Sequence, residues 1–589
     1  MSSIGTGLNA GALRLQVYNN FRGVDFTDEN VNESRSPDAL NMWKNYKTLG
    51  KKIETRPGIV NELTETYTIF GLFFYTINNV DHWIIHEGVK LIDYNPTTET
   101  TTILKATGMN TRKSVGFVFN NILFIKDGLN YLEYNGTTIT DVSGTIPNIA
   151  IHNIISGETK MIQEANLLTD YVTEQYIPDG NETTFYLSQK GVSNISVWDI
   201  SGVTPVVIST GYTTDTSAGK VVFDTAPTLS TNGATIEIKY SKTSDGATMV
   251  KKCTLACQFD NRVFFSGNPD YPNMLIWCGL NDPRYIGVTN YSTQGTDISQ
   301  IKALVPGNNA LWVFKEPSQE NTTIFYNVPV EVYDSKLEQT IKTYASSHSS
   351  ISTGCVSTGV NFNDDICFFS DRGLEGISSD ITTEQAIAHR STLIDSRLLS
   401  DSGYENLEIC EWEGYLLVSL GNKVYLADSH QRVQNNDHME YEWFYWDLGV
   451  DINVMREHNG TLYICTKEKT IDGVTTSHIY SLTDNEEDRE IESYWCTKKD
   501  DFGYPQMLKT TNKKGFKSEV SGTTIKIETK LDNNDFVELG TFTNTKGYIV
   551  TKLKRKKWNK MQLKYSSTKP FGLYSAVVES YIGSYVKRW

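Results

Sequence analysis

Residues 83–96 and 123–136 repeat each other at an offset of 40 residues, and this repeat is the strongest constraint that the sequence places on the fold. The two segments read WIIHEGVKLIDYNP and LFIKDGLNYLEYNG. Their identical pairs are Ile85 and Ile125, Gly88 and Gly128, Tyr94 and Tyr134, and Asn95 and Asn135. Two short strands joined by a tight turn, recurring at this period, are typical of β-propeller blades. The repeat predicts an array of small antiparallel sheets, in which function belongs to the channel, the rims or inserted segments.

The composition also favours strands. The chain has 32 Tyr, 24 Phe and 11 Trp beside only 15 Pro, and no long stretch keeps a helical period. Aromatic and β-branched residues are enriched in strands. At 589 residues the chain exceeds what one hydrophobic core usually serves, so we expect several domains or one large propeller with additions. We therefore predict an all-β protein.

Blade-like units recur downstream of the repeat. The second strongly apolar residue of each unit serves as an anchor, and successive anchors are 48, 56, 48 and 47 residues apart: Phe264, Trp312, Phe368, Leu416 and Tyr463. These gaps suit four-stranded blades with variable loops. The interval from Phe124 to Phe264 is 140 residues, which is one blade plus about 100 further residues. We predict a β-propeller of about six to seven blades with an insertion in this interval.

The sequence divides into five parts. Short alternating strands between Gly and Asn turns predict a β-sandwich in the insertion, and alternation in TIKIETK and MQLKY predicts another at the C-terminal end. The predicted parts are an extended N-terminal arm (1–60), the first blades (61–149), an inserted β-sandwich module (150–250), the remaining blades (251–483) and a C-terminal β-sandwich with closing strands (484–589).

Charge and apolar runs limit the classes of partner. Seventy acidic against 54 basic residues give a net charge of −16, which disfavours tight binding of nucleic acid over the whole surface. A duct through which DNA slides remains compatible, because an acidic wall repels phosphate. The sequence has no signal-peptide core and no run of 18 apolar residues, so we expect a soluble chain without a membrane span. Its eight Cys lie mostly in apolar contexts and are expected to be buried thiols.

Candidate catalytic and metal-binding residues are weak. His82 and His86 share a strand face, as Cys253 and Cys257 would, but neither pair has further ligands nearby in sequence. We expect a solvent-facing histidine pair and buried thiols. The sequence has no P-loop, H-E-x-x-H, G-x-S-x-G or G-x-G-x-x-G motif, and its paired carboxylates sit in turn-like segments. We expect no enzymatic activity, no catalytic residue, no metal and no cofactor.

One basic cluster surrounds Trp558 against the acidic background. Its members are Lys552, Lys554, Arg555, Lys556, Lys557, Lys560 and Lys564. Alternation along strands would place them on both faces, as in a solvated sheet edge protected by Lys. They could equally form an assembly contact with an acidic neighbour, or a band that faces DNA in a channel.

The segment from 20 to 60 carries a resemblance to a known family. It contains the cluster Pro37, Asp38, Ala39 and Asn41, followed by the element Lys52, Arg56, Pro57 and Gly58. This ordered set resembles the opening of tail hub or nozzle proteins of short-tailed bacteriophages. The matched element covers about 40 of 589 residues, and a propeller with sandwich insertions agrees with it in architecture. Gly and Pro at these positions indicate an extended arm that crosses neighbouring elements or packs on its own propeller.

The resemblance implies a structural virion protein. In such proteins six copies form a ring below the portal and adaptor, and double-stranded genome DNA passes transiently along its axis. The chain would be made in the host cytoplasm and end in the virion tail, with itself and other tail proteins as partners. Two alternatives stay open: a receptor-binding or glycan-degrading β-propeller of a phage tail, and a cellular propeller scaffold that binds peptides.

Overall fold

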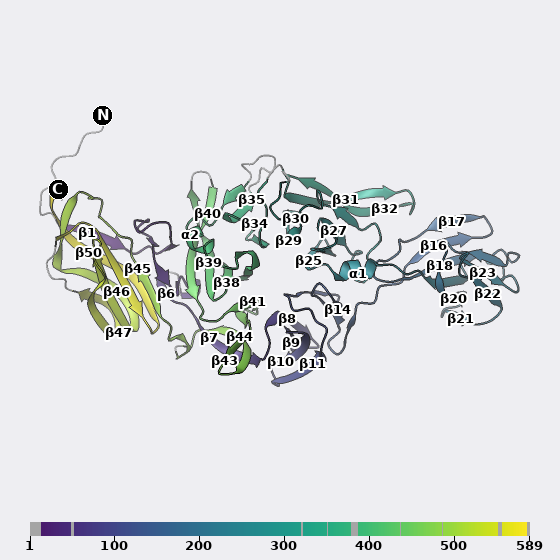
Figure 1. Ribbon diagram of the computed structural model, residues 1–589, viewed down its shortest axis with the longest axis horizontal. Helices are drawn as coiled ribbons and strands as arrows, with labels where there is room; N and C mark the ends of the chain where they lie inside the picture. The colour runs from purple at the N-terminus through teal and green to yellow at the C-terminus, as the bar shows by residue number, and fades with distance from the viewer. Residues whose placement is uncertain are drawn as a thin grey trace, which may run out of the picture. The chain divides into compact units, whose positions relative to one another are not determined.

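The regular secondary structure of the computed structural model (Figure 1) is almost all β, because strands account for 57% of the structure and helices for 3%. The all-β prediction is confirmed. The structure describes residues 13–48, 52–319, 322–349, 352–377, 387–435, 438–485, 487–551 and 557–585.

The chain forms two compact units. Unit 1 takes its residues from Met1–Ile69, Cys367–Ser379 and Gln385–Trp589, and unit 2 from Phe70–Ile366 and Asp380–Glu384. The described helices are short: η1 (Tyr46–Thr48), α1 (Gly246–Lys251), α2 (Asp395–Leu398), η3 (Tyr404–Asn406) and η4 (Glu487–Arg489). None of these helices is long and apolar enough to cross a membrane.

Unit 2 contains four antiparallel sheets of four strands each, and in each sheet the strands follow one another in chain order. The first two sheets are β8 (Ile69–Ile77), β9 (Val80–Glu87), β10 (Lys90–Asn95) and β11 (Thr100–Lys105), and β12 (Val115–Phe119), β13 (Ile122–Lys126), β14 (Tyr131–Tyr134) and β15 (Ile139–Asp141). The next two are β25 (Leu255–Phe259), β26 (Arg262–Ser266), β27 (Met274–Trp277) and β28 (Tyr291–Thr293), and β29 (Ile301–Gly307), β30 (Ala310–Lys315), β31 (Ile324–Asp334) and β32 (Gln339–His348).

The 40-residue repeat corresponds to the second and third strands of the first two sheets. Gly88 and Gly128 occupy equivalent turns with φ of 56° and 83°, a region that favours glycine. Asn95 and Asn135 then begin equivalent turns, because each side-chain oxygen accepts the backbone N–H groups two and three residues later at 2.9–3.1 Å. Two of the four identical pairs therefore shape the turns of this sheet unit, while the Ile and Tyr pairs are buried in its strands.

The segment between β15 and β25 folds into two further sheets of unit 2. The six-stranded sheet has the order β17-β16-β18-β24-β20-β21, and the three-stranded sheet has the order β19-β23-β22. Buried side chains from both sheets, including Val172, Phe185, Val221 and Ile238, share one core. The strands are β16 (Asn148–Asn153), β17 (Glu158–Met161), β18 (Tyr171–Ile177), β19 (Thr184–Tyr186), β20 (Ser193–Asp199), β21 (Val206–Ile208), β22 (Tyr212–Asp215), β23 (Lys220–Phe223) and β24 (Ile236–Ser241).

The chain returns from unit 2 to unit 1 within a four-stranded sheet of β33 (Gly359–Phe362), β34 (Asp365–Ser370), β35 (Gly373–Ile377) and β36 (Ile387–His389). Two more four-strand units follow in unit 1. They are β37 (Glu408–Trp412), β38 (Tyr415–Leu420), β39 (Lys423–Asn435) and β40 (His438–Asp447), and β41 (Ile452–His458), β42 (Thr461–Thr466), β43 (Lys469–Ile471) and β44 (Val474–Thr483). Strand β7 (Gly58–Glu65) completes the last unit by pairing with β44.

The predicted blade anchors all lie on equivalent strands. Each is in the second strand of a four-strand unit: Phe264 in β26, Trp312 in β30, Phe368 in β34, Leu416 in β38 and Tyr463 in β42. All six second strands, counting β13 with Phe124, bury at least four of their residues. The four-strand period is thus correct, while closure of these sheets into one propeller stays a prediction.

The C-terminal strands extend a large sheet of unit 1. They are β45 (Ser493–Cys496), β46 (Met507–Leu531), β47 (Val537–Thr551), β48 (Lys557–Trp558), β49 (Met561–Ser567) and β50 (Phe571–Tyr585). The 25-residue strand β46 pairs with β47, β49 and β50 along different parts of its length. N-terminal strands join the same sheet: β1 (Leu13–Tyr18), β2 (Gly23–Val24), β3 (Arg35–Ser36), β4 (Ala39–Leu40), β5 (Met42–Trp43) and β6 (Ile53–Thr55).

Candidate functional site

The candidate site is the junction in unit 1 where the two halves of the N-terminal motif meet. Asn41 lies between β4 and β5 with φ of 57°, a left-handed conformation that Asn tolerates. Its side-chain oxygen accepts Arg56 Nε at 3.0 Å and the backbone N–H of Asp447 at 2.8 Å. Its Nδ2 donates to the carbonyl of Glu492 at 2.8 Å. One amide therefore connects the arm, the end of β40 and the approach to β45.

Arg56 is buried at the centre of this junction. Besides Asn41, its guanidinium donates to the carbonyl oxygens of Pro57 at 2.8 Å and Asp447 at 2.9 Å. Burial lowers the pKa of Arg56 to about 10, against the opposing effect of the Asp447 charge. A group with this pKa is still charged at neutral pH, so a buried cation is held here by carbonyl dipoles.

The other predicted arm residues border the same junction. Asp38 Oδ1 accepts Arg397 Nη2 and the Tyr494 hydroxyl, both at 3.1 Å. Pro37 is half-buried and Pro57 is buried. At Gly58 a β-carbon would lie 2.3 Å from the carbonyl oxygen of Asp488, so this close approach requires glycine. The structure brings Asn41, Arg56 and Pro57 into direct contact, whereas Asp38 contacts Arg397 and Tyr494, and Gly58 lies against Asp488. All of these partners belong to unit 1 of the same chain.

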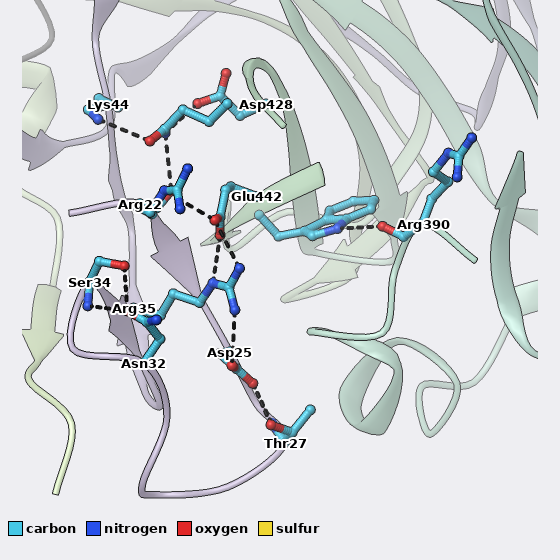
Figure 2. A network of polar contacts seen from close by, with 12 residues as sticks. Arg22, Asp25, Thr27, Asn32, Ser34, Arg35, Lys44, Arg390, Asp428 and Glu442 are labelled. Carbon is cyan, nitrogen blue, oxygen red and sulfur yellow. Dashed lines mark hydrogen bonds and ion pairs between the residues drawn. The ribbon is translucent and has the colours of Figure 1, made fainter. Parts of the chain in front are cut away.

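A network of buried charges lies on the same arm (Figure 2). Glu442 on β40 has a fully buried side chain and accepts Arg35 through two bonds, Nε to Oε2 at 2.8 Å and Nη2 to Oε1 at 3.0 Å. Arg22 Nε lies 3.4 Å from Oε1 of the same carboxylate, and Asp25 lies 3.7 Å from Arg35. The two-bond pair of Arg35 and Glu442 joins the arm to β40. It defines the relative orientation of the two side chains and offsets the cost of burying their charges.

A second buried carboxylate, Asp428, extends this network. Its Oδ2 accepts the Tyr46 hydroxyl at 2.5 Å and Gln431 Nε2 at 2.7 Å. Gln431 Oε1 accepts Lys44 Nζ at 3.2 Å. Burial, together with the bond to Asp428, raises the pKa of Tyr46 well above its usual value, so this phenol stays a donor at all ordinary pH.

His389 on β36 lies between two carboxylates of unit 1. Its Nδ1 lies 3.2 Å from Glu375 Oε1 and its Nε2 lies 2.5 Å from Asp395 Oδ2. Desolvation lowers the pKa, but the bonds to Asp395 and Glu375 outweigh it and raise the pKa to about 10. The ring is an imidazolium at neutral pH, and it acts as a cation between two carboxylates.

The predicted solvent-facing pair of His82 and His86 is wrong. The His86 side chain is fully buried, with Nδ1 3.1 Å from Ser114 Oγ and Nε2 3.2 Å from the carbonyl of Gly88. His82 is partly buried, and its Nδ1 lies 2.8 Å from Asp93 Oδ2, which also accepts the Tyr134 hydroxyl at 2.8 Å. Both imidazoles therefore make polar contacts with neighbouring residues. The mainly apolar sequence of the strand gives no sign of these contacts.

The predicted pair of Cys253 and Cys257 does not share a strand face. Cys253 follows α1 and is buried, while Cys257 lies on β25 and is half-buried. Burial raises the pKa of the Cys253 thiol to about 11, so it is protonated at neutral pH. Six of the eight cysteines are buried: Cys253, Cys278, Cys355, Cys367, Cys465 and Cys496. Within the described ranges, no group of three or more His, Cys, Asp or Glu side chains could hold a metal ion.

The predicted basic cluster lies only partly within the described residues. Lys552, Lys554, Arg555 and Lys556 lie outside the described residues. Lys557 on β48 is exposed, and Lys560 is half-buried in the turn before β49. Trp558 between them is buried and donates from Nε1 to Thr511 Oγ1 at 3.0 Å. A contact of these lysines with a neighbouring copy or with DNA stays a prediction.

Sequence reasoning missed the network around Glu442 and the pair of carboxylates around His389. For Glu442 a signal existed, because the run YEWFYW places one acid among large aromatic residues of a strand. A charge in such a setting is buried on one face and needs a partner. The partner, Arg35, lies 407 residues away, and no local pattern names it.

Comparison with known proteins gives little further information. No family model matches this chain, and no curated protein matches it. The solved structure of BBS1N in complex with ARL6DN is 8% identical, with 73% of this chain and 99% of that chain covered and a TM-score of 0.24. An exo-β-1,3-galactanase from Phanerochaete chrysosporium is 8% identical, with 56% and 94% covered and a TM-score of 0.20. At these TM-scores neither likeness assigns a fold or an activity to this chain.

Proposed function

We propose that this chain is a non-enzymatic structural virion protein of a short-tailed bacteriophage. In this proposal several copies, six by resemblance to tail hub or nozzle proteins, form a ring below the portal and adaptor. The ring lines the channel through which the genome is ejected. A net charge of −16 suits such a channel, because an acidic wall does not retain phosphate groups.

The observation that carries the proposal is the contact between Asn41 and Arg56. The resemblance rests on two sequence elements, and each residue type in them is common by itself. In the structure the two elements bond to each other over 15 positions of chain and close one buried junction. An ordered set of residues that depend on one another is a better mark of a family than separate matches would be.

A ring requires contacts between copies, and strand β1 offers a suitable surface. Its Leu13, Leu15 and Val17 alternate along the strand and are 45%, 61% and 43% exposed. Among the described residues β1 pairs only with β50, so its other edge is open for a strand or for apolar packing. Exposed apolar residues on a sheet edge are typical of an interface, and the occupant that we propose is a second copy of this chain.

The test is the assembly state and the virion location. Light scattering and electron microscopy of the full-length protein at rising concentration should show a closed ring, and gold-labelled antibody should mark the tail of the virion. Leu15→Glu should shift the protein toward monomers without lowering its melting temperature. Val203→Glu, at an exposed turn position of the insertion, is the matched control and should leave the ring intact.

Two results would overturn the proposal. One is a protein that stays monomeric at every concentration and with virion extract present. The other is an antibody that labels no part of the virion while it recognises the purified protein.

A further inference from the structure

Unit 1 contains a cleft that the ring proposal does not use. It has a volume of about 620 Å³, within the range of small-molecule sites. One wall is formed by the turns at 421–422 and 449–451, which come directly before β39 and shortly after β40 in the chain. The other wall is formed by the end of β42, strand β43 and one face of β44. Gly421 and Gly449 have no side chain, so a ligand can approach the backbone at these two positions.

The face of β44 supplies an aromatic surface. Thr476, His478 and Tyr480 alternate along the strand, so all three side chains point to the same side, and all three line the cleft. The ring centroids of His478 and Tyr480 are 5.3 Å apart with an interplanar angle of 34°. A tyrosine of this kind offers an apolar ring face and a polar hydroxyl at once.

His478 is held in one tautomer. Its Nδ1 lies 3.0 Å from Asn61 Oδ1 and 3.1 Å from Thr64 Oγ1. The amide oxygen can only accept, so Nδ1 carries the proton and Nε2 is an acceptor. Burial lowers the pKa of His478, which keeps the ring neutral near pH 7. The cleft therefore contains an uncharged acceptor in a fixed orientation.

The charged residues of the lining balance one another. Asp451 and Glu468 are acidic, while Lys467 and Lys469 are basic. Asp451 Oδ1 lies 3.2 Å from Lys467 Nζ, and the Lys467 N–H donates to the Asp451 carbonyl at 2.9 Å. Glu468 Oε2 accepts the N–H of Thr68 at 3.2 Å. With no excess of either sign, this lining favours neither a phosphate nor an isolated cation.

We propose that this cleft binds a neutral saccharide. A pyranose has an apolar face that packs on the Tyr480 ring, and hydroxyls that both donate and accept. The carboxylate of Asp451 accepts from such hydroxyls, the ammonium of Lys467 donates to them, and charged partners strengthen both kinds of bond. The mixture of one aromatic face with paired donors and acceptors fits a polyhydroxylated neutral ring better than it fits an anion, and this property goes beyond a structural role in a ring.

The test is saturation-transfer NMR on the full-length protein. The probes are glucose, galactose, N-acetylglucosamine, lactose and cellobiose, with inorganic phosphate as the anionic probe. At least one sugar should show transfer, with affinity about tenfold weaker in Tyr480→Ala and in Asp451→Ala, as expected for losing about 1.4 kcal/mol of contact. Tyr333→Ala, at an exposed tyrosine of unit 2, is the matched control and should bind as the parent does.

Asp451 lies in an exposed turn, so Asp451→Ala should fold even if Tyr480→Ala does not. The proposal is overturned if none of the five sugars binds, whether or not phosphate does. It is also overturned if a sugar binds with equal affinity to the parent and to folded Asp451→Ala. Because the sugars are tested on whatever oligomer the protein forms, these outcomes are independent of the presence of a ring.

Discussion

Arg35 and Glu442 lie 407 residues apart in the chain and form a two-bond ion pair at 2.8 and 3.0 Å. The Glu442 carboxylate has no exposed surface, whereas Arg35 remains slightly open to solvent. A carboxylate in this position depends on its cationic partner, because its own desolvation is uncompensated without it. The pair therefore fixes the N-terminal arm to β40 more specifically than apolar packing would.

Arg35→Met should lower the free energy of unfolding of unit 1 by about 3 kcal/mol, because it leaves a buried charge with Arg22 as its remaining cation. Urea denaturation followed by Trp fluorescence measures this change. Arg372→Met, at an exposed side chain, is the matched control and should change the midpoint little. Adding Glu442→Gln to Arg35→Met should recover part of the loss, and equal or greater instability of the double variant would contradict this account.

Arg56→Lys should destabilise unit 1 although the charge is kept. The guanidinium spans three carbonyl oxygens on Asn41, Pro57 and Asp447, and an ammonium cannot reach all three from one position. We expect a loss of about 2 kcal/mol, from one or two buried acceptors left without a donor. Thermal unfolding measures it, with Arg14→Lys, at an exposed position of β1, as the control. Equal melting temperatures for Arg56→Lys and the parent would show that the junction is not the source of stability.

The sheet units could be read from the sequence because their determinants are local. Gly88 with Gly128, and Asn95 with Asn135, shape turns through their own backbone and the next three residues, so the same pattern recurs wherever the same turn does. The apolar second strand is equally local, which is why Phe264 and the later anchors were placed correctly.

The contacts of the candidate site could not be predicted from the sequence, because their determinants are not local. The partners of Asn41, Arg56 and Glu442 come from strands that are distant in sequence, and their pairing depends on the tertiary arrangement of unit 1. His86 illustrates the same limit in unit 2. Its burial follows from which face of β9 is covered, and alternation alone does not say which face that is.

His389 should make the stability of unit 1 fall at alkaline pH. Its folded pKa of about 10 lies above the usual value of 6.5, so the stabilisation is fully present below pH 6.5 and is lost as the pH rises toward 10. Urea unfolding at pH 6, 8 and 10 should show this decline, and His389→Gln should flatten it. An unchanged slope in His389→Gln would mean that other groups cause the decline.

His86 should have the opposite effect in unit 2, at acid pH. Burial lowers its folded pKa to about 4, below the usual 6.5, so the unfolded chain takes up a proton first as the pH falls. The cost grows from pH 6.5 downward and reaches about 3 kcal/mol near pH 4. His86→Gln keeps hydrogen-bonding groups near Ser114 and Gly88 without titrating, and should reduce the acid dependence of unfolding. His348→Gln, at an exposed histidine of unit 2, is the matched control for the loss of an imidazole.

The two-sheet segment between β16 and β24 depends on one buried carboxylate, Glu174. This side chain has no exposed surface and accepts His152 Nε2 at 2.7 Å, the hydroxyls of Tyr176 at 3.1 Å and Tyr240 at 2.5 Å, and the N–H of Ser188 at 3.0 Å. Burial alone would raise its pKa, but the bonds from His152, Tyr240 and Ser188 outweigh burial and lower it. Four donors from four positions of the segment therefore converge on an ionised group.

Glu174→Gln replaces that acceptor by an amide that carries two donors of its own, and at least one of them would face another donor. We expect the segment to lose about 3 kcal/mol of stability, and to open while the four-strand sheets stay folded. Hydrogen exchange resolved by peptide should show faster exchange in β18 and β24 and unchanged exchange in β26 and β30. Glu237→Gln, at a half-buried position of β24 where the carboxylate accepts Gln175 Nε2 at 3.0 Å, is the matched control and should leave exchange unchanged. If Glu174→Gln accelerates exchange equally in β26 and β30, the segment does not unfold as a separate module, because its core is then coupled to those sheets.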